Sequence, residues 1–162
     1  MPILTRPRRQ RARYQALSIP ARRLSRVAPA LLWFHRATVN KTILLVDDDL
    51  HSREGLRQSL VGGGFLVETA QDGAQAIKRM IESEVGMAII DLDLPPVKGV
   101  TISGWDVVRI CRAFDAAMPI IVVSAEGGPE VKARAKELKV LECLEKPIAP
   151  GQVKGIVRAI DP

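Results

Sequence analysis

The chain has 162 residues, of which 47% are hydrophobic and 4% aromatic, and a formal net charge of +6. This length suits one domain of ordinary size with a mainly aliphatic core. No apolar run approaches the ~20 residues that a membrane-spanning helix needs, so the composition excludes a helical membrane protein and favours a soluble one.

The basic charge is concentrated at the start of the chain. Residues 1–40 contain nine Arg and no Asp or Glu, whereas the rest of the chain holds 15 basic and 18 acidic side chains. We therefore expect a basic, disordered extension over 1–40 and one folded domain over 41–162. Arginine without acids can also bind the phosphates of nucleic acid or an anionic membrane surface. A start codon assigned upstream of the true one would leave a similar preface, and all three interpretations stay open.

From residue 41 onward, short apolar runs alternate with amphipathic stretches of helix length. Strands are predicted over 43–46, 65–69, 86–90, 119–123 and 140–144. Helices are predicted over 50–61, 72–83, 105–114, 129–138 and 152–160. Three of the five strands are continuously apolar, as expected when helices cover both faces of a parallel sheet. The pattern predicts an α/β fold, with a doubly wound five-stranded parallel sheet between two layers of helices.

Function in such sheets collects at the carboxyl ends of the strands. Four of the five predicted strands end in polar residues: Asp47, Asp48, Asp49, Asp91, Asp93, Ser124 and Lys146. In a sheet of order 2-1-3-4-5 these residues meet at one edge. Clustered carboxylates repel one another unless a cation lies among them, and oxygen ligands without His or Cys favour Mg²⁺ (or Mn²⁺) over zinc. A carboxylate beside such a metal can attack a phosphoryl group while a lysine neutralises the charge of the transferring oxygens.

Four segments closely resemble the signature blocks of bacterial receiver domains, the phosphoacceptor domains of two-component response regulators. They are ILLVDDD at 43–49, IIDLDLP at 89–95, IVVSA at 121–125 and EKP at 145–147. Each block alone is a weak motif, but all four occur in order at the expected strand ends. The resemblance covers residues 41 to about 160 and implies the flavodoxin-like fold with strand order 2-1-3-4-5.

The resemblance also implies a role for each residue at the sheet edge. Asp91 would be the phosphoacceptor, forming an aspartyl phosphate. Asp48 would bind Mg²⁺ directly, Asp47 would support the metal largely through water, and the backbone carbonyl of Asp93 would complete the ligand set. Ser124 matches the hydroxyl that bonds the phosphoryl group, and Lys146 matches the position that pairs with it.

The function implied is phosphorelay signalling in the cytoplasm. The donor would be a sensor histidine kinase or a histidine phosphotransfer protein, and the chain would catalyse only its own phosphorylation and dephosphorylation. Because the sequence stops at Pro162, just past the last predicted helix, we expect a stand-alone, chemotaxis-regulator-like receiver that signals by protein–protein contact. The downstream target is not identified by the sequence.

Two features depart from the receiver pattern. The segment 96–104 is longer than usual, with 100–103 resembling an insertion between two candidate matching glycines, Gly99 and Gly104. Cys143 stands where the family often has an aromatic residue, three positions before the lysine. Cys143 and Cys111 are the only cysteines; their spacing excludes a metal cluster, and we expect small buried hydrophobic residues in a reducing compartment.

Three alternatives remain at this point. Asp47–49 could simply be acids at a helix N-terminus, and Lys146 a solvated surface lysine. The Asp-x-Asp at 91–93 also resembles the nucleophile pair of haloacid-dehalogenase-type phosphatases, although the second acidic pair then lies on the wrong side of it in sequence. Lastly, the chain could be a basic nucleic-acid-binding protein that uses residues 1–40, with the receiver-like domain as a scaffold.

Overall fold

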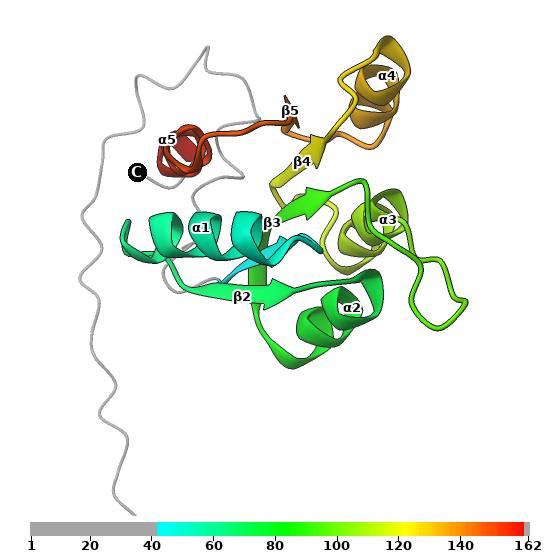
Figure 1. The fold of residues 1–162 in the computed structure, drawn as a ribbon, viewed down its shortest axis with the longest axis horizontal. Coiled ribbons are helices and arrows are strands. Elements are labelled where there is room, and N and C mark those ends of the chain that lie inside the picture. The colour runs from blue at the N-terminus through cyan, green and yellow to red at the C-terminus, as the bar shows by residue number, and fades with distance from the viewer. Residues whose placement is uncertain (1–41, 161–162) are drawn as a thin grey trace, which may run out of the picture. The chain divides into compact units, whose positions relative to one another are not determined.

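The computed structural model describes residues 42–160. The predictions for residues 1–40, including the disordered extension and its nucleic-acid or membrane contacts, lie outside these residues. Within them, strands and helices alternate strictly along the chain (Figure 1). The strands are β1 (Thr42–Val46), β2 (Val67–Ala70), β3 (Val85–Asp91), β4 (Ile120–Ser124) and β5 (Glu142–Glu145). The helices are α1 (Leu50–Val61), α2 (Gly73–Glu82), α3 (Gly104–Phe114), α4 (Pro129–Glu137) and α5 (Pro150–Ile160).

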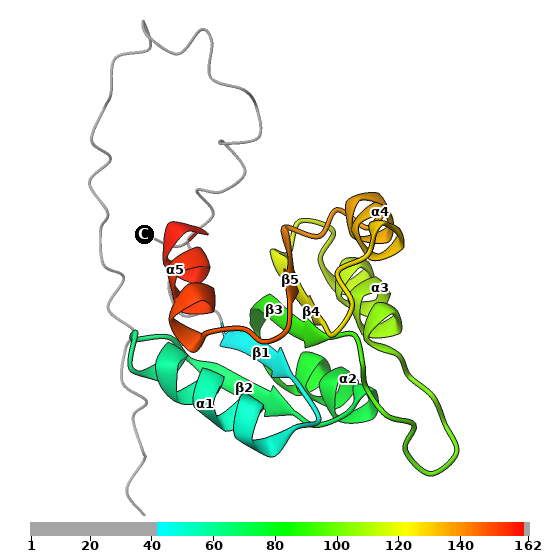
Figure 2. The ribbon, with the colours of Figure 1, turned by 45° about the horizontal axis from the view of Figure 1, so that its top comes forward.

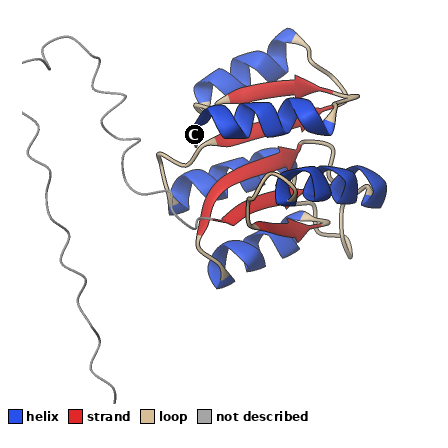
Figure 3. Ribbon diagram, turned by 90° about the vertical axis from the view of Figure 1, so that its left-hand side faces the viewer, coloured by secondary structure: helices blue, strands red, loops and turns tan. Residues whose placement is uncertain are grey.

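The five strands form one parallel sheet in the order β2-β1-β3-β4-β5, which confirms the predicted doubly wound fold. Successive side chains of a strand point to opposite faces of the sheet. Ile43 and Leu45 of β1 pack in a core with residues of α1 and α5, while Leu44 and Val46 pack in a second core with residues of α2 and α3. Figure 3 shows helices on both faces of the sheet. This two-sided burial explains why the central strands are continuously apolar.

Side-chain caps fix where three of the helices begin. The carboxylate of Asp49 accepts the N–H of Ser52 at the start of α1, and that of Asp72 accepts the N–H of Gln75 at the start of α2. Ser103 and Asp106 form a reciprocal capping box at the start of α3. Helix α4, by contrast, begins at Pro129 after the N-cap residue Gly128, and it has no side-chain cap. Of the three acidic residues at 47–49, Asp49 therefore caps a helix. This is the role that the helix N-terminus alternative assigned to the whole run.

Two predicted strands start too early. The second was expected from residue 65, but the N–H of Phe65 donates to the Leu60 carbonyl and so belongs to the turn that closes α1. The fifth was expected from residue 140, but the N–H of Val140 donates to Ala135 and closes the end of α4. Lys139 there has a φ of 53°, in the left-handed region. In both places the chain completes a helix C-terminus before it enters the sheet.

The long segment after β3 forms a small hairpin. Val97 and Val100 exchange two backbone hydrogen bonds, and the residues between them, Lys98 and Gly99, have φ values of 51° and 77°. Positive φ at both central positions is typical of the two-residue type I′ turn. In Figures 1 and 2 this segment, in yellow-green, projects beyond α2 and α3. The hairpin thus occupies 97–100, whereas residues 101–103 lead on to α3 without regular secondary structure. The insertion at 100–103 stays a prediction from the sequence.

Both cysteines are free. Cys111 is fully buried in the core beneath α2 and α3, with its sulfur 3.3 Å from that of Met80, and burial raises the pKa of its thiol to about 11. Cys143 is half-buried and packs against the same core. Both are therefore small core residues, as predicted, although Cys143 is less buried than expected.

Candidate functional site

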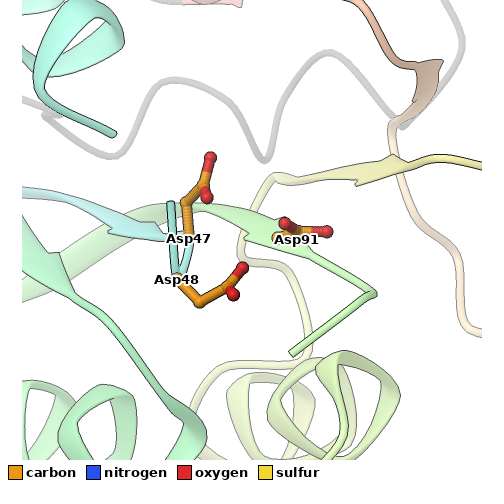
Figure 4. Close-up of side chains that lie close together, drawn as sticks. All are labelled: Asp47, Asp48 and Asp91. Atoms are coloured by element: carbon orange, nitrogen blue, oxygen red, sulfur yellow. The ribbon is translucent and has the colours of Figure 1, made fainter. Parts of the chain in front are cut away.

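Three carboxylates meet at the carboxyl ends of two neighbouring central strands (Figure 4). Asp47 and Asp48 follow β1, and Asp91 ends β3. One carboxylate oxygen from each residue lies within 4.8 Å of the other two. Asp47 and Asp91 are buried, with Asp91 only 2% exposed, whereas Asp48 faces solvent. The sequence prediction that these carboxylates share one edge therefore agrees with the geometry.

Lys146 supplies the cation nearest to Asp91. It directly follows β5, and its Nζ lies 2.5 Å from Asp91 Oδ2. Burial raises the pKa of Asp91 above its ordinary value, and the hydrogen bonds from Lys146 and from the Asp93 N–H only partly offset this effect. Burial lowers the pKa of Lys146, but the hydrogen bond to Asp91 and the charges of Asp91 and Asp47 outweigh it, so the pKa lies above its usual value. The ammonium is therefore held in its charged form beside the candidate acceptor.

Ser124 ends β4 next to this pair. Its side chain is buried, and its Oγ accepts the N–H of Glu126 at 3.2 Å. Its carbonyl accepts the N–H of Lys146 at 2.9 Å, which ties the ends of β4 and β5 together. Among the described residues its Oγ makes no hydrogen bond to Asp91 or Lys146. The hydroxyl therefore lies at the predicted strand end but bonds its own loop in this state.

The first turn of α1 holds Asp47 in place, a support that the sequence analysis missed. Ser52 Oγ donates to Asp47 Oδ2 at 2.7 Å, and the Asp49 N–H donates to Asp47 Oδ1 at 2.9 Å. Arg53 reaches back to the Asp47 carbonyl at 2.6 Å. The sequence did contain a signal for this support. A helix capped at Asp49 places Ser52 and Arg53 in its first turn, close to the end of β1. Asp47 is thus an oriented carboxylate with both oxygens already hydrogen-bonded.

Asp93 makes a contact that the sequence analysis also missed. Its N–H donates to Asp91 Oδ1 at 2.9 Å, and its carboxylate accepts the N–H of Ala125 at 2.8 Å. The predicted metal role concerned only the backbone carbonyl of Asp93. Nothing in the sequence pattern indicates the Ala125 contact, because it joins residues 32 positions apart.

The donor set suits a hard divalent cation. Only carboxylates make up the group within reach of one another, and no His or Cys of residues 42–160 belongs to it. In the same range nothing hydrogen-bonds to the exposed carboxylate of Asp48, whereas both oxygens of Asp47 are engaged. This difference fits direct metal binding by Asp48 and a supporting role for Asp47.

The comparisons with known proteins give one consistent result. The model of the response regulator receiver domain matches residues 43–158. The chain is 31% identical over 118 residues to the probable transcriptional regulatory protein SilR of Salmonella typhimurium, covering 73% of this chain and 50% of SilR. It is 32% identical over 120 residues to the transcriptional regulatory protein GltR of Pseudomonas aeruginosa, covering 74% of this chain and 48% of GltR. The chain thus spans about half the length of the curated relatives it matches.

Solved structures show the same fold. The chemotaxis protein CheY4 of Vibrio cholerae superposes with a TM-score of 0.66 at 25% identity, covering 74% of this chain and 98% of CheY4. The receiver domain of HemR from Leptospira biflexa gives 0.66 at 24% identity, covering 75% and 94%. Among residues 42–160, no helix combines the length and apolarity needed to cross a membrane. The match over 43–158 leaves no support for the phosphatase hypothesis, and the chain belongs to the family of response regulator receiver domains.

Proposed function

We propose that Asp91 accepts a phosphoryl group from a phosphohistidine of a sensor histidine kinase or a histidine phosphotransfer protein. The observation that carries this proposal is the pairing of a buried Asp91, at the end of a central strand, with Lys146 at 2.5 Å. This arrangement costs folding free energy, because Asp91 is a buried carboxylate with one cation beside it and two further carboxylates within 4.8 Å. Such an arrangement is typical of a functional site rather than of a stabilising ion pair.

The transfer follows from the positions of these side chains. A carboxylate oxygen of Asp91 forms a bond to phosphorus as the bond between phosphorus and the donor imidazole nitrogen breaks. The electron pair of that bond stays on the imidazole, which takes up a proton. Lys146 neutralises part of the negative charge on the phosphoryl oxygens, and the Ser124 hydroxyl donates to one of them once it leaves the Glu126 N–H.

The acidic group supplies the metal site. Asp47, Asp48 and the backbone carbonyl of Asp93 would hold Mg²⁺ (or Mn²⁺), which when bound supplies positive charge to the phosphoryl oxygens. Asp48 offers a free carboxylate at the solvent side, and Ser52 and the Asp49 N–H hold Asp47 in a fixed orientation behind it.

The response to phosphorylation would pass through the loop after β4. Helix α4 begins without a side-chain cap, directly after Gly127 and Gly128, so little local structure has to be broken when this loop moves. The resemblance to receivers places the changed surface on α4, β5 and α5, where a downstream protein would bind. We further propose that the protein acts in the cytoplasm, that residues 41–162 form the receiver, and that its only catalysis is its own phosphorylation and dephosphorylation. The match over 43–158 favours this function over nucleic-acid binding with a scaffold domain.

The test is incubation of the full chain with acetyl phosphate and Mg²⁺, followed by intact-mass measurement. We expect the wild type to gain one phosphoryl group, and we expect no gain after EDTA is added or when Asp91 is changed to Asn. An equal gain in wild type and Asp91→Asn would move the acceptor to another residue. No gain in a folded wild-type protein that binds Mg²⁺ would contradict phosphoacceptor function.

A further inference from the structure

Asp93 connects the candidate acceptor with the loop after β4. Its N–H donates to Asp91 Oδ1, while its carboxylate accepts the N–H of Ala125 at 2.8 Å. Asp91 and Val123 are paired in the sheet, so the two chain segments leave neighbouring strands side by side. Asp93 is the second residue after Asp91, and Ala125 is the second after Val123. Asp93 is therefore hydrogen-bonded both to the acceptor residue Asp91 and to the loop after β4.

The Asp93 contact is the link from this loop to the β3 side of the site. Within the described residues, the N–H of Glu126 bonds to Ser124 of the same loop, and α4 begins at Pro129 without a side-chain cap. The Ala125 N–H alone, of these loop donors, bonds to a residue that follows β3. A hydrogen bond with a charged acceptor is among the stronger ones in proteins, so it can fix the position of a loop that contains two consecutive glycines.

Phosphorylation of Asp91 would add a dianion close to Asp93, whose N–H bonds to Asp91 Oδ1. A phosphoryl group has three acceptor oxygens and needs donors, whereas the carboxylate of Asp93 repels it. The Ala125 N–H directly follows Ser124, the hydroxyl proposed to bond the phosphoryl group, and its present acceptor is the exposed side chain of Asp93. The two anions thus compete for one donor.

We propose that Asp93 is a positioning residue that holds the loop after β4 in its unphosphorylated position, through the bond from Ala125, and that the phosphoryl group on Asp91 displaces it from that donor. This inference rests on the proposed function of Asp91. It assigns the Asp93 side chain a role separate from that of its backbone carbonyl. The displaced bond stabilises the unphosphorylated state, so removing the Asp93 carboxylate should favour phosphorylation.

Three variants of the full chain separate charge from hydrogen bonding. Asp93→Ala removes both the charge and the acceptor, and Asp93→Asn removes the charge but keeps an oxygen acceptor. Glu130→Gln is the matched control, because it removes one exposed negative charge of α4 that forms no salt bridge among the described residues. The first readout is hydrogen exchange of the Ala125 amide by NMR in Mg²⁺-free, unphosphorylated protein. We expect exchange about tenfold faster in Asp93→Ala, and within about threefold of wild type in Asp93→Asn and Glu130→Gln.

The second readout is the initial rate of phosphorylation at saturating Mg²⁺ over a range of acetyl phosphate concentrations. We expect Asp93→Ala to raise the maximal rate about fivefold, Asp93→Asn to raise it less, and Glu130→Gln to match wild type. Unchanged Ala125 exchange in Asp93→Ala would overturn the holding role. Equal acceleration in Asp93→Ala and Asp93→Asn would assign the effect to charge and overturn the competition for the N–H. If none of the four proteins is phosphorylated, the proposed function fails and the displacement step fails with it, while the exchange data still decide whether Asp93 holds the loop.

Discussion

Gly104, the first residue of α3, lies directly against the backbone of Asp91. A Cβ at position 104 would come within 2.3 Å of the Asp91 carbonyl oxygen and 2.6 Å of the Leu92 Cα. Gly99, the other glycine of this segment, has nothing within 4 Å of its own Cβ position and needs glycine only for its φ of 77°. The helix after the long segment can thus start beside the acceptor only because residue 104 has no side chain.

We therefore expect Gly104→Ala to disturb the acceptor, whereas Gly99→Ala should disturb only the hairpin. Overpacking against backbone atoms should lower the free energy of unfolding by about 1–3 kcal/mol in Gly104→Ala. Gly99→Ala should lower it by about 1–2 kcal/mol, because alanine is strained at positive φ. Urea unfolding gives both values, and phosphorylation by acetyl phosphate separates the two variants. Gly104→Ala should lose most of the phosphorylation rate and Gly99→Ala should keep it; equal rates would show that the contact with Asp91 is not needed for the site.

Removing the cation beside Asp91 should make stability depend on pH. In Lys146→Met the buried carboxylate keeps Asp47 as a neighbour but loses its partner, so its already raised pKa should rise further. We expect a loss of unfolding free energy of about 1–3 kcal/mol at neutral pH. A carboxyl with a raised folded-state pKa is destabilising when ionised and harmless when protonated. The loss should therefore be largest at pH 7 and should shrink as the pH falls toward and through the pKa of Asp91.

The control for this experiment is Arg109→Met, which breaks an exposed ion pair with Asp106 at 3.1 Å. Exposed pairs contribute little, so the expected loss is under about 0.5 kcal/mol with no change between pH 7 and pH 5. Urea unfolding of both variants at these two pH values gives the comparison. A Lys146→Met loss that stays constant with pH would mean that the lysine acts through packing and not through the charge of Asp91.

The sequence contains enough information for the sheet and for the strand-end residues, for a simple reason. Burial on both faces forces long apolar runs in the strands, and polar residues can return only where each strand leaves the core. The end of an apolar run in the sequence therefore identifies Asp47, Asp91 and Ser124. The strand order, by contrast, was implied by the resemblance to receiver domains, and the observed sheet confirms it.

The missing parts involve contacts between loops or between a helix and a loop. The bond from Ala125 to Asp93 depends on how two loops approach in space, which residue spacing does not encode. The same applies to Ser52, whose hydroxyl reaches Asp47 only because α1 turns back over the end of β1. The starts of β2 and β5 were also misplaced, since hydrogen bonds that close the preceding helices compete with strand formation there. The sequence pattern thus predicts which elements form, whereas the hydrogen bonds at the helix C-termini decide where the following strands begin.

Asp47 and Asp48 should respond differently to the loss of their charge. Asp48→Asn should leave the metal-free protein at least as stable as wild type, because its exposed carboxylate has no hydrogen bond among residues 42–160 and its loss relieves repulsion with Asp47 and Asp91. Its thermal midpoint should, however, no longer rise when Mg²⁺ is added, since binding stabilises only a protein that keeps its ligands. Asp47→Asn weakens the bonds from Ser52 and from the Asp49 N–H, so it should lose about 1 kcal/mol even without metal. Thermal unfolding of the wild type and both variants, with Mg²⁺ and with EDTA, provides the six midpoints, and an unchanged Mg²⁺ shift in Asp48→Asn would remove that residue from the ligand set.

Arg112 joins α3 to both neighbouring turns and is expected to be the most sensitive arginine of residues 42–160. Its guanidinium donates to three backbone carbonyls: Met118 before β4, and Leu138 and Lys139 at the end of α4. Burial lowers the pKa of this group, and no carboxylate of the described residues forms a salt bridge with it. Arg112→Ala leaves three carbonyls without this donor, so we expect a loss of about 2–3 kcal/mol in urea unfolding.

Arg112→Lys should recover only part of that loss, because an ammonium cannot reproduce the planar fork that reaches three carbonyls at once. Arg158→Ala, at an exposed position in the last turn of α5, is the comparison and should change stability by less than about 0.5 kcal/mol. Full recovery in Arg112→Lys would mean that one positive charge suffices and that the fork geometry is not what holds the end of α4. If the fork does hold it, α4 is fixed at its C-terminal end and uncapped at its N-terminal end, so a movement that starts at Ser124 should swing the start of the helix while its end stays on α3.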